Sequence, residues 1–359
     1  MRCSRVARPI MSDIAGIDSK AERKLVVVGA SAGGVTALRK LVSDLPADFP
    51  APVLIVLHIG SHPSMLPALL SSAGPLPAVE VEDGSPLVPG RVGVAPPDHH
   101  LLVDQNTVRL SRGPKEHHTR PAIDPLFRSA ALAHGARVIG VVLTGHLDDG
   151  TAGLQAIKAC GGIAVVQDPR DAQEPSMPLS AMHHVDVDHC LPIDAIGKAL
   201  TRLVKEKTLP KAASVSAGLS HEHALSVAPP SEAAMEHLEA IADPSTLACP
   251  DCGGTLWEIR HARPARFRCH TGHAYTLRTL AHSMSGTTEH ALQAALRALQ
   301  EQAILLRKAA RSIRESGSAD EAIAIEAGAV HAEDQARTLR QLTERPPMRP
   351  VERDLAAGD

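Results

Sequence analysis

Aromatic side chains are scarce in this chain of 359 residues, which contains only three Phe, one Tyr and one Trp. Aromatic residues usually supply much of the buried apolar area of a domain, so a core with so few rings has to be aliphatic. Three of the five rings, Trp257, Phe267 and Tyr275, lie close together late in the sequence. The scarcity therefore predicts a large aliphatic core in the N-terminal part and a small, separate aromatic core near the C-terminus.

The chain also lacks a strong net charge and a long apolar run. Its formal net charge is −3, which gives no electrostatic reason to expect a nucleic-acid or membrane partner. No apolar run approaches the roughly 20 residues that a membrane-spanning helix needs. Residues 1–23 lack the apolar centre of a signal peptide and are predicted to form a short tail. These absences favour a cytoplasmic protein without membrane insertion.

Cysteine is too rare for a disulfide scaffold, since there are six in the whole chain. The spacing of the last three is informative, because a Cys-x-x-Cys pair is followed by Cys-x-x-x-His, a pattern typical of tetrahedral zinc sites. We predict a structural Zn²⁺ bound by Cys249, Cys252, Cys269 and His273. His270 is the alternative fourth ligand, and a reduced, metal-free turn is the alternative structure. Nearby arginines permit a nucleic-acid-binding ribbon, but no interleaved stacking surface is evident.

Strand and helix patterns alternate between residues 24 and 206. The expected strands are 25–29, 53–58, 92–95, 101–104, 138–144 and 163–167. The expected helices are 34–43, 63–71, 124–134, 151–159 and 192–206. Apolar, β-branched strands separated by helices predict an α/β domain with a doubly wound, mainly parallel sheet.

The remainder of the chain predicts three further segments. Residues 207–244, rich in Ala, Ser, Pro and Glu, are expected to form a linker with one short helix. Residues 245–282 form the zinc-ribbon-like module, and residues 287–345 form a helical hairpin. Leucines recur every seven residues in the first helix of that hairpin. This seam is best explained by packing within the hairpin, although a second chain or a receptor helix bundle would also fit it.

Ser31 occupies a corner between a predicted strand and a predicted helix. The run that ends at Ala30 is apolar and β-branched, and Gly29, Ser31 and Gly33 match Gly-x-Ser-x-Gly, which exposes a serine hydroxyl at a sharp turn. A phosphate-binding loop is a weaker interpretation, because Ser31 stands where Gly-x-Gly-x-x-Gly requires glycine and no Gly-Lys-[Ser/Thr] is present. The third interpretation is an ordinary glycine-rich corner with a capping serine.

Two further polar residues are expected at the same edge of the sheet as Ser31. His58 closes the second strong strand, and Asp149 follows a third such strand. In a doubly wound sheet, functional groups collect at the carboxyl ends of the strands. Ser31, His58 and Asp149 therefore suggest a nucleophile, a base and an orienting acid. An ordinary strand-end histidine and an aspartate that caps the following helix remain the alternatives.

An ordered set of motifs resembles the catalytic domain of the chemotaxis methylesterase CheB over roughly residues 24–205. The matching motifs are Gly29-Ala-Ser-Ala-Gly-Gly34, the strand-end His58, Val81-Glu-Asp-Gly84, Val94-Ala-Pro-Pro97, Arg120-Pro-Ala-Ile-Asp124 with Phe127, Leu143-Thr-Gly-His-Leu-Asp-Asp-Gly150 and Ser176-Met-Pro178. The resemblance implies a protein-glutamate methylesterase that acts on the cytoplasmic helices of methylated chemoreceptors. Many members of this family also deamidate receptor glutamines. No cofactor is implied for the catalysis.

The resemblance assigns the triad to Ser31, His58 and Asp149. We expect the backbone N–H groups of Ala32 and His146 to bind the oxyanion. Arg120 is a candidate for attracting the acidic receptor helices. The family commonly has Met-Gly where this chain has His146 and Leu147, so an esterase for a different ester is an alternative.

A second alternative, from a different class, is a non-catalytic docking module in a signalling complex. The C-terminal helices are then the expected contact for a signalling partner. The N-terminal tail is too short for the phospho-receiver domain that often precedes this catalytic domain, because such domains run to about a hundred residues or more. Regulation by that domain is therefore not expected within this chain.

Overall fold

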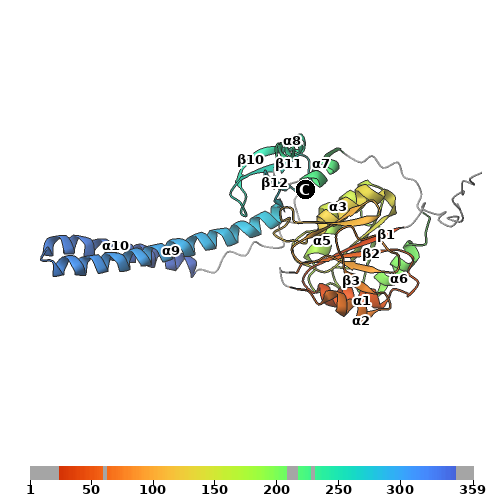
Figure 1. The fold of residues 1–359 in the computed structure, drawn as a ribbon, viewed down its shortest axis with the longest axis horizontal. Helices are drawn as coiled ribbons and strands as arrows, with labels where there is room; N and C mark the ends of the chain where they lie inside the picture. Colours follow the sequence, from red (N-terminus) through yellow and green to blue (C-terminus); the bar gives the residue numbers. More distant parts are fainter. Residues whose placement is uncertain (1–23, 60–62, 208–216, 228–230, 345–359) are drawn as a thin grey trace, which may run out of the picture. The chain divides into compact units, whose positions relative to one another are not determined.

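The computed structural model describes residues 24–59, 63–207, 217–227 and 231–344, so the predicted tail at 1–23 lies outside the described residues. The chain divides into two compact units with the boundary between Ile241 and Ala242. Figure 1 shows an α/β domain in the first unit and a small sheet followed by long helices in the second. Among the described residues, no helix combines the length and the apolar character required to cross a membrane.

A seven-stranded sheet forms the centre of the first unit, in the order β3-β4-β2-β1-β7-β8-β9. All six pairings between neighbouring strands are parallel. The strands are β1 (Leu25–Ala30), β2 (Val53–Leu57), β3 (Ala78–Glu80), β4 (Val92–Val94), β7 (Val138–Val142), β8 (Ile163–Gln167) and β9 (His189–Leu191). Every residue of β1, β2 and β7 is buried, as expected for parallel strands covered on both faces.

Helices cover both faces of this sheet and create two aliphatic cores. On one face pack α1 (Gly34–Ser43), α2 (Leu66–Ala73) and α6 (Ile193–Leu203). On the other face pack α3 (Ile123–His134), α4 (Thr151–Ala159) and α5 (Ser176–His184). Along β1, Val26 and Val28 belong to the first core while Leu25 and Val27 belong to the second. The predicted doubly wound α/β architecture is therefore confirmed for this unit.

Some elements differ from the sequence expectation. Strand 101–104 is not part of the parallel sheet; it lies in β5 (His100–Asp104), which forms a separate antiparallel pair with β6 (Thr107–Ser111). Strands β3 and β9 and helix α5 were not predicted. The two strands have only three residues each, and α5 begins with Ser-Met-Pro. Segments this short carry too little periodicity to be recognised.

The predicted linker at 207–244 is wrong where the structure describes it. Helices α7 (Ala217–Val227) and α8 (Glu232–Ile241) occupy this segment, and both belong to the first unit. The side chain of Arg128 on α3 is buried, and its Nη2 donates to Glu116 at 2.6 and 2.7 Å and to Ser226 of α7 at 2.8 Å. A buried ion pair completed from another helix leaves no signal in local composition, so the attachment of α7 could not be anticipated.

The second unit begins with a four-stranded antiparallel sheet in the order β10-β11-β12-β13. The strands are β10 (Ala242–Ala248), β11 (Thr255–Ile259), β12 (Arg266–Cys269) and β13 (Ala274–Thr276). Its small core contains Leu256, Phe267, Tyr275 and Leu280 together with two of the cysteines. Trp257, expected in this core, is half-buried and lies outside the cluster.

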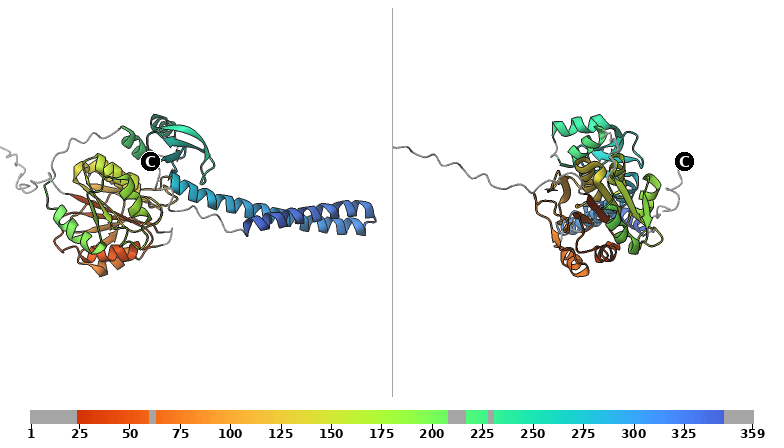
Figure 2. Two further views of the ribbon diagram at one scale, coloured as in Figure 1. Left: turned by 180° about the vertical axis from the view of Figure 1, so that it is seen from behind. Right: turned by 90° about the vertical axis from the view of Figure 1, so that its right-hand side faces the viewer.

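Two long helices follow, α9 (Leu277–Glu315) and α10 (Ala319–Thr343), and they lie side by side (Figures 1 and 2). The α9 helix begins ten residues before the expected 287, because Thr276 and Thr279 form a reciprocal capping box there. Ser318, the residue before α10, is followed three residues later by Glu321, a spacing that predicts a capping box, but its side chain makes no capping hydrogen bond and this prediction is wrong. Small residues line the contact, with Ala303 and Ala310 of α9 and Ala322 and Ala329 of α10 all buried.

Candidate active site

Three polar side chains meet at the carboxyl edge of the parallel sheet. Ser31 follows β1, His58 follows β2, and Asp149 lies in the turn between β7 and α4. The chain builds the sheet outward from β1 through β2 in one direction and from β7 through β8 in the other. The gap between β1 and β7 is therefore the topological switch point, where open α/β sheets place their functional crevice.

The three side chains form a continuous hydrogen-bonded chain. His58 Nδ1 lies 3.0 Å from Ser31 Oγ, and His58 Nε2 lies 2.7 Å from Asp149 Oδ2. An ionised carboxylate only accepts hydrogen bonds, so the imidazole proton belongs on Nε2. That tautomer leaves the lone pair of Nδ1 directed at the serine hydroxyl. The arrangement prepares Ser31 to lose its proton to His58 as it attacks an electrophile.

Asp149 is buried, and several donors surround its carboxylate. The backbone N–H groups of Ile123 and Asp124, in the first turn of α3, donate to it at 2.7 and 3.0 Å, and its own neighbour Gly150 donates at 2.8 Å. Burial opposes ionisation, but the nearby charge of His117 and the hydrogen bond from His58 outweigh it and lower the pKa of Asp149 to about 2. The side chain thus faces the positive end of α3 instead of capping α4.

The turn that carries Ser31 is fixed by its neighbours. Gly33 adopts φ +76°, which favours glycine, and α1 starts at the next residue. The N–H of Ser31 donates to the carbonyl of Thr144 at 2.9 Å, and Thr144 Oγ1 donates to the carbonyl of Ala32 at 2.9 Å. A Cβ on Gly145 would lie 2.7 Å from Ser31 Cβ and 2.1 Å from Met177 Sδ. The loop after β7 therefore approaches the serine as closely as glycine permits.

His117 is a member of the site that the sequence did not reveal. It is buried, its Nε2 lies 3.0 Å from Asp124 Oδ2, and it lies 3.6 Å from Asp149 Oδ1. Burial disfavours its charge, but Asp149 and Asp124 outweigh this and raise the pKa of His117 to about 9. The imidazolium thus compensates two buried carboxylates. Its position three residues before Arg120-Pro-Ala-Ile-Asp124 was the one available signal.

The residues expected to bind the oxyanion and the substrate differ in how they are placed. Within the described chain, no protein acceptor is recorded for the N–H of Ala32 or of His146. Arg120, in contrast, is fully engaged: it donates to Asp98 at 2.9 and 2.5 Å and to the carbonyl of Gly113 at 2.7 Å. These contacts give Arg120 a structural role, while its attraction of the acidic receptor helices stays a prediction.

An apolar hollow of about 310 Å³ lies near the catalytic edge. Leu57 and Ile59, the neighbours of His58 in the chain, form part of its lining, together with Val35, Met65 and Leu69. These last three side chains are all substantially exposed, Met65 to 70%. A shallow apolar surface of this kind is suited to contact with another macromolecule.

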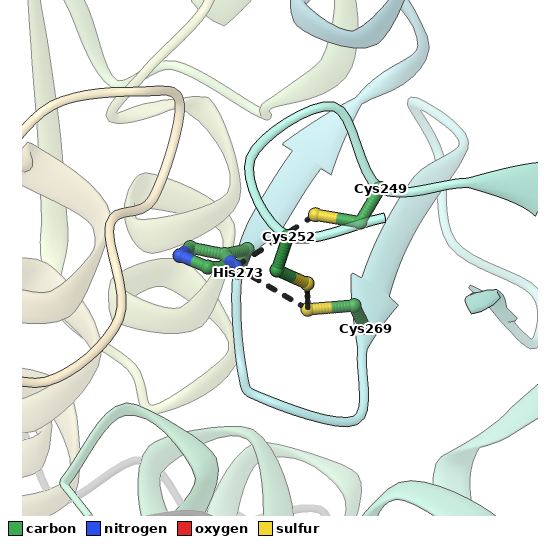
Figure 3. A group of neighbouring side chains, drawn as sticks. All are labelled: Cys249, Cys252, Cys269 and His273. Carbon is green, nitrogen blue, oxygen red and sulfur yellow. Dashed lines mark hydrogen bonds between the residues drawn. The ribbon is translucent and has the colours of Figure 1, made fainter. Parts of the chain in front are cut away.

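The four predicted metal ligands come together in the second unit. The donor atoms of Cys249, Cys252, Cys269 and His273 all lie within 4.8 Å of one another (Figure 3). His270, the alternative ligand, is exposed. Its ring packs against Gly254 so closely that a Cβ added to Gly254 would lie 2.3 Å from it. Of the two histidines, the structure brings His273 and not His270 together with the three cysteines.

Comparison with known proteins agrees with the geometry of the first unit. Residues 26–200 match the model of the CheB methylesterase family. A putative protein-glutamate methylesterase/protein-glutamine glutaminase of Leptospira interrogans is 38% identical over 180 residues, which are 50% of this chain and 93% of that protein. The chain belongs to the CheB methylesterase family.

Two further relatives each match about half of the chain. Protein-glutamate methylesterase/protein-glutamine glutaminase 2 of Anaeromyxobacter dehalogenans is 40% identical over 183 residues, 51% of this chain and 54% of that protein. The crystal structure of the Thermotoga maritima CheB methylesterase catalytic domain is 34% identical, covering 51% of this chain and all of that one, with a TM-score of 0.49. The second unit lies beyond the residues that match the CheB model.

The close approach of Gly145 to Ser31 predicts that Gly145→Ala impairs catalysis. The added methyl group collides with Ser31 Cβ and Met177 Sδ, so the serine or the loop has to move. We expect kcat/KM for a methyl ester to fall at least tenfold, which is about 1.4 kcal/mol of transition-state stabilisation. Gly286→Ala, where an added Cβ meets no atom, is the control. Equal activity of the two variants would show that the approach is not required.

The raised pKa of His117 predicts a specific pH dependence of stability. A group whose pKa is higher in the folded state stabilises the fold fully below its unfolded pKa, and this contribution is lost as the pH rises through the folded pKa. For His117 the window runs from 6.5 to about 9, which corresponds to about 3 kcal/mol. Between these pH values the free energy of unfolding should therefore decrease in the wild type by about 3 kcal/mol more than it does in His117→Gln. Urea unfolding at several pH values measures it, with the exposed His183→Gln as control; identical pH profiles for wild type and His117→Gln would contradict the assignment.

Proposed function

We propose that this CheB-family chain hydrolyses glutamyl methyl esters on chemoreceptors, with Ser31, His58 and Asp149 as catalytic residues. The hydrogen-bonded chain of these three side chains at the switch point of the sheet is the observation that carries the proposal. The names of the relatives add protein-glutamine glutaminase activity. We extend this second reaction to the chain, because an amide can enter the same acyl-enzyme pathway.

The reaction follows from the positions of the atoms. Ser31 Oγ attacks the γ-carbonyl carbon while His58 Nδ1 accepts the hydroxyl proton, and Asp149 stabilises the imidazolium through Nε2. His58 then returns the proton to the leaving methanol, or to ammonia when the substrate is a glutamine. Water, deprotonated by His58, cleaves the acyl-enzyme and releases glutamate. The backbone N–H groups of Ala32 and His146 are assigned to the oxyanion, and one such donor is typically worth about 3 kcal/mol.

The receptor contact is assigned to the apolar hollow near His58. Substrate glutamates lie on helices, and a helix offers an apolar stripe that fits a shallow groove. Val35, Met65 and Leu69 are exposed at this hollow and offer an apolar surface against which such a stripe can pack. This contact would act on the protein substrate as a whole and would leave the chemistry at Ser31 unchanged.

We place the enzyme in the cytoplasm with the cytoplasmic receptor helices as its substrate. The paired helices α9 and α10 are interpreted as a helical hairpin available to a signalling partner. Arg307 on α9 is paired with Glu333 on α10 at 2.8 Å, which supports packing within the hairpin.

Methanol release from a methylated receptor cytoplasmic fragment tests the function. We expect release with the wild-type chain and none above background with Ser31→Ala, since the nucleophile is lost. Ser43→Ala, on the exposed end of α1, should retain full activity. Release that persists in Ser31→Ala would overturn the assignment of the nucleophile. If the wild-type chain released no methanol from the receptor fragment but hydrolysed other methyl esters, the result would favour the alternative substrate that His146 and Leu147 suggest.

A charge in the apolar hollow should separate receptor binding from chemistry. We expect Met65→Glu to raise KM for the receptor fragment at least tenfold and to leave turnover of a small, activated ester unchanged. Met284→Glu, an exposed methionine on α9, is the matched control. If Met65→Glu lowered activity toward both substrates, or left activity toward both unchanged, the assignment of the hollow would be wrong.

A further inference from the structure

The geometry points to a structural zinc site in the second unit, bound by Cys249, Cys252, Cys269 and His273. None of these residues belongs to the proposed catalytic triad, and all lie outside the region that matches the CheB family. The inference therefore stands independently of the proposed function.

Three of the six distances between the donor atoms agree closely with tetrahedral coordination, and all six are below 4.8 Å. Zn–S bonds of about 2.3 Å and Zn–N bonds of about 2.0–2.1 Å place two sulfur ligands about 3.8 Å apart and a sulfur and a nitrogen about 3.5 Å apart. Cys252 Sγ and Cys269 Sγ are 3.7 Å apart. His273 Nδ1 lies 3.7 Å from Cys249 Sγ and 3.5 Å from Cys269 Sγ (Figure 3). These edges differ from the ideal tetrahedron by about 0.2 Å or less.

Two tight turns hold the ligands. In the first turn, Gly253 N–H donates to the Cys249 carbonyl at 2.8 Å, and Cys249 N–H donates to the Gly254 carbonyl at 2.7 Å. In the second turn, Gly272 N–H donates to the Cys269 carbonyl at 2.9 Å, and Cys269 N–H donates to the His273 carbonyl at 3.0 Å. Gly253 and Gly272 have φ of +73° and +97°, so each turn uses a glycine where the backbone is left-handed. The ligands are thus fixed by the backbone and not by side-chain packing alone.

The alternatives to a metal explain the arrangement poorly. The sulfur atoms of Cys252 and Cys269 are much farther apart than the roughly 2.05 Å of a disulfide. The neighbouring hydrophobic core is small, and small modules without a large core usually rely on metals or disulfides. Four protein ligands also leave no open coordination position. A structural role is therefore favoured over a catalytic one.

Thr271 lies next to the ligands. Its Oγ1 lies 2.9 Å from Cys269 Sγ, 3.1 Å from His273 Nδ1 and 3.3 Å from Cys252 Sγ, so its single proton is donated to one of the two thiolates at a time. Hydrogen bonds of this kind orient metal-binding thiolates and moderate their charge, and their loss typically lowers metal affinity about 10–100-fold. Thr271→Val should therefore weaken zinc binding within that range without abolishing it.

The test is the metal content of the full-length chain purified without a metal-affinity tag and measured by mass spectrometry. We expect one zinc per chain in the wild type and its loss in His273→Ala and Cys252→Ser. His270→Ala and Cys190→Ser, which change the same residue types outside the cluster, should retain zinc. His273→Cys, which supplies a thiolate in place of the imidazole, should also retain it. Substitution with Co²⁺ should give the visible spectrum of a tetrahedral thiolate site in the wild type.

Three results would overturn the inference. A zinc-free wild type that also fails to take up added Zn²⁺ would exclude the site. Iron in place of zinc would assign a different metal centre. Loss of zinc in His270→Ala with retention in His273→Ala would show that the ligand set is wrong. Circular dichroism of each variant distinguishes loss of the metal from loss of the whole fold, and the His273→Cys variant tests the site even if His273→Ala does not fold.

Discussion

The buried carboxylate of Asp149 is the constraint around which the first unit is organised. Placing an ionised group in an aliphatic interior is costly unless hydrogen bonds and opposite charge compensate it. Here the start of α3 supplies two backbone donors and His117 supplies a positive charge. Because these groups already satisfy Asp149, the carboxylate can hold His58 in one orientation and one tautomer. The orientation of His58 thus depends on the position at which α3 begins.

The same constraint explains which parts of the site the sequence could predict. Ser31 and His58 directly follow buried strands, and Asp149 follows another, so the rule that functional groups collect at strand ends made them candidates, and the resemblance to the CheB family assigned their roles. His117 lies on no regular element and acts through a contact with Asp124 and Asp149 that only the folded chain creates. The structural contacts of Arg120 were hidden for a related reason, because its pairing with Asp98 exists only in the folded chain.

The fold was predictable to a similar depth. Long apolar strands and amphipathic helices gave the doubly wound sheet, since each of these elements is determined largely by its own residues. Strands β3 and β9 depend on a neighbouring strand for their definition, and α7 is attached through a hydrogen bond from Arg128, which is itself ion-paired with Glu116, to Ser226. Both kinds of element are specified by tertiary contacts that override local composition.

We expect the chemistry and the specificity of this site to depend on different positions of the loop after β7. The serine turn is held by the hydrogen bond from Ser31 N–H to the Thr144 carbonyl, by the one from Thr144 Oγ1 to the Ala32 carbonyl, and by the close approach of Gly145, so we expect substitutions there to alter the reaction itself. Two residues further along the same loop, Leu147 adopts φ +63° and His146 is exposed, with its ring 3.4 Å from Glu174. We expect a change of side chain at His146 or Leu147 to alter the contacts with the substrate and to leave the positions of Ser31, His58 and Asp149 unchanged. The departure from the common family pattern at His146 and Leu147 is therefore expected to act on substrate choice and to leave the Ser31–His58–Asp149 mechanism intact.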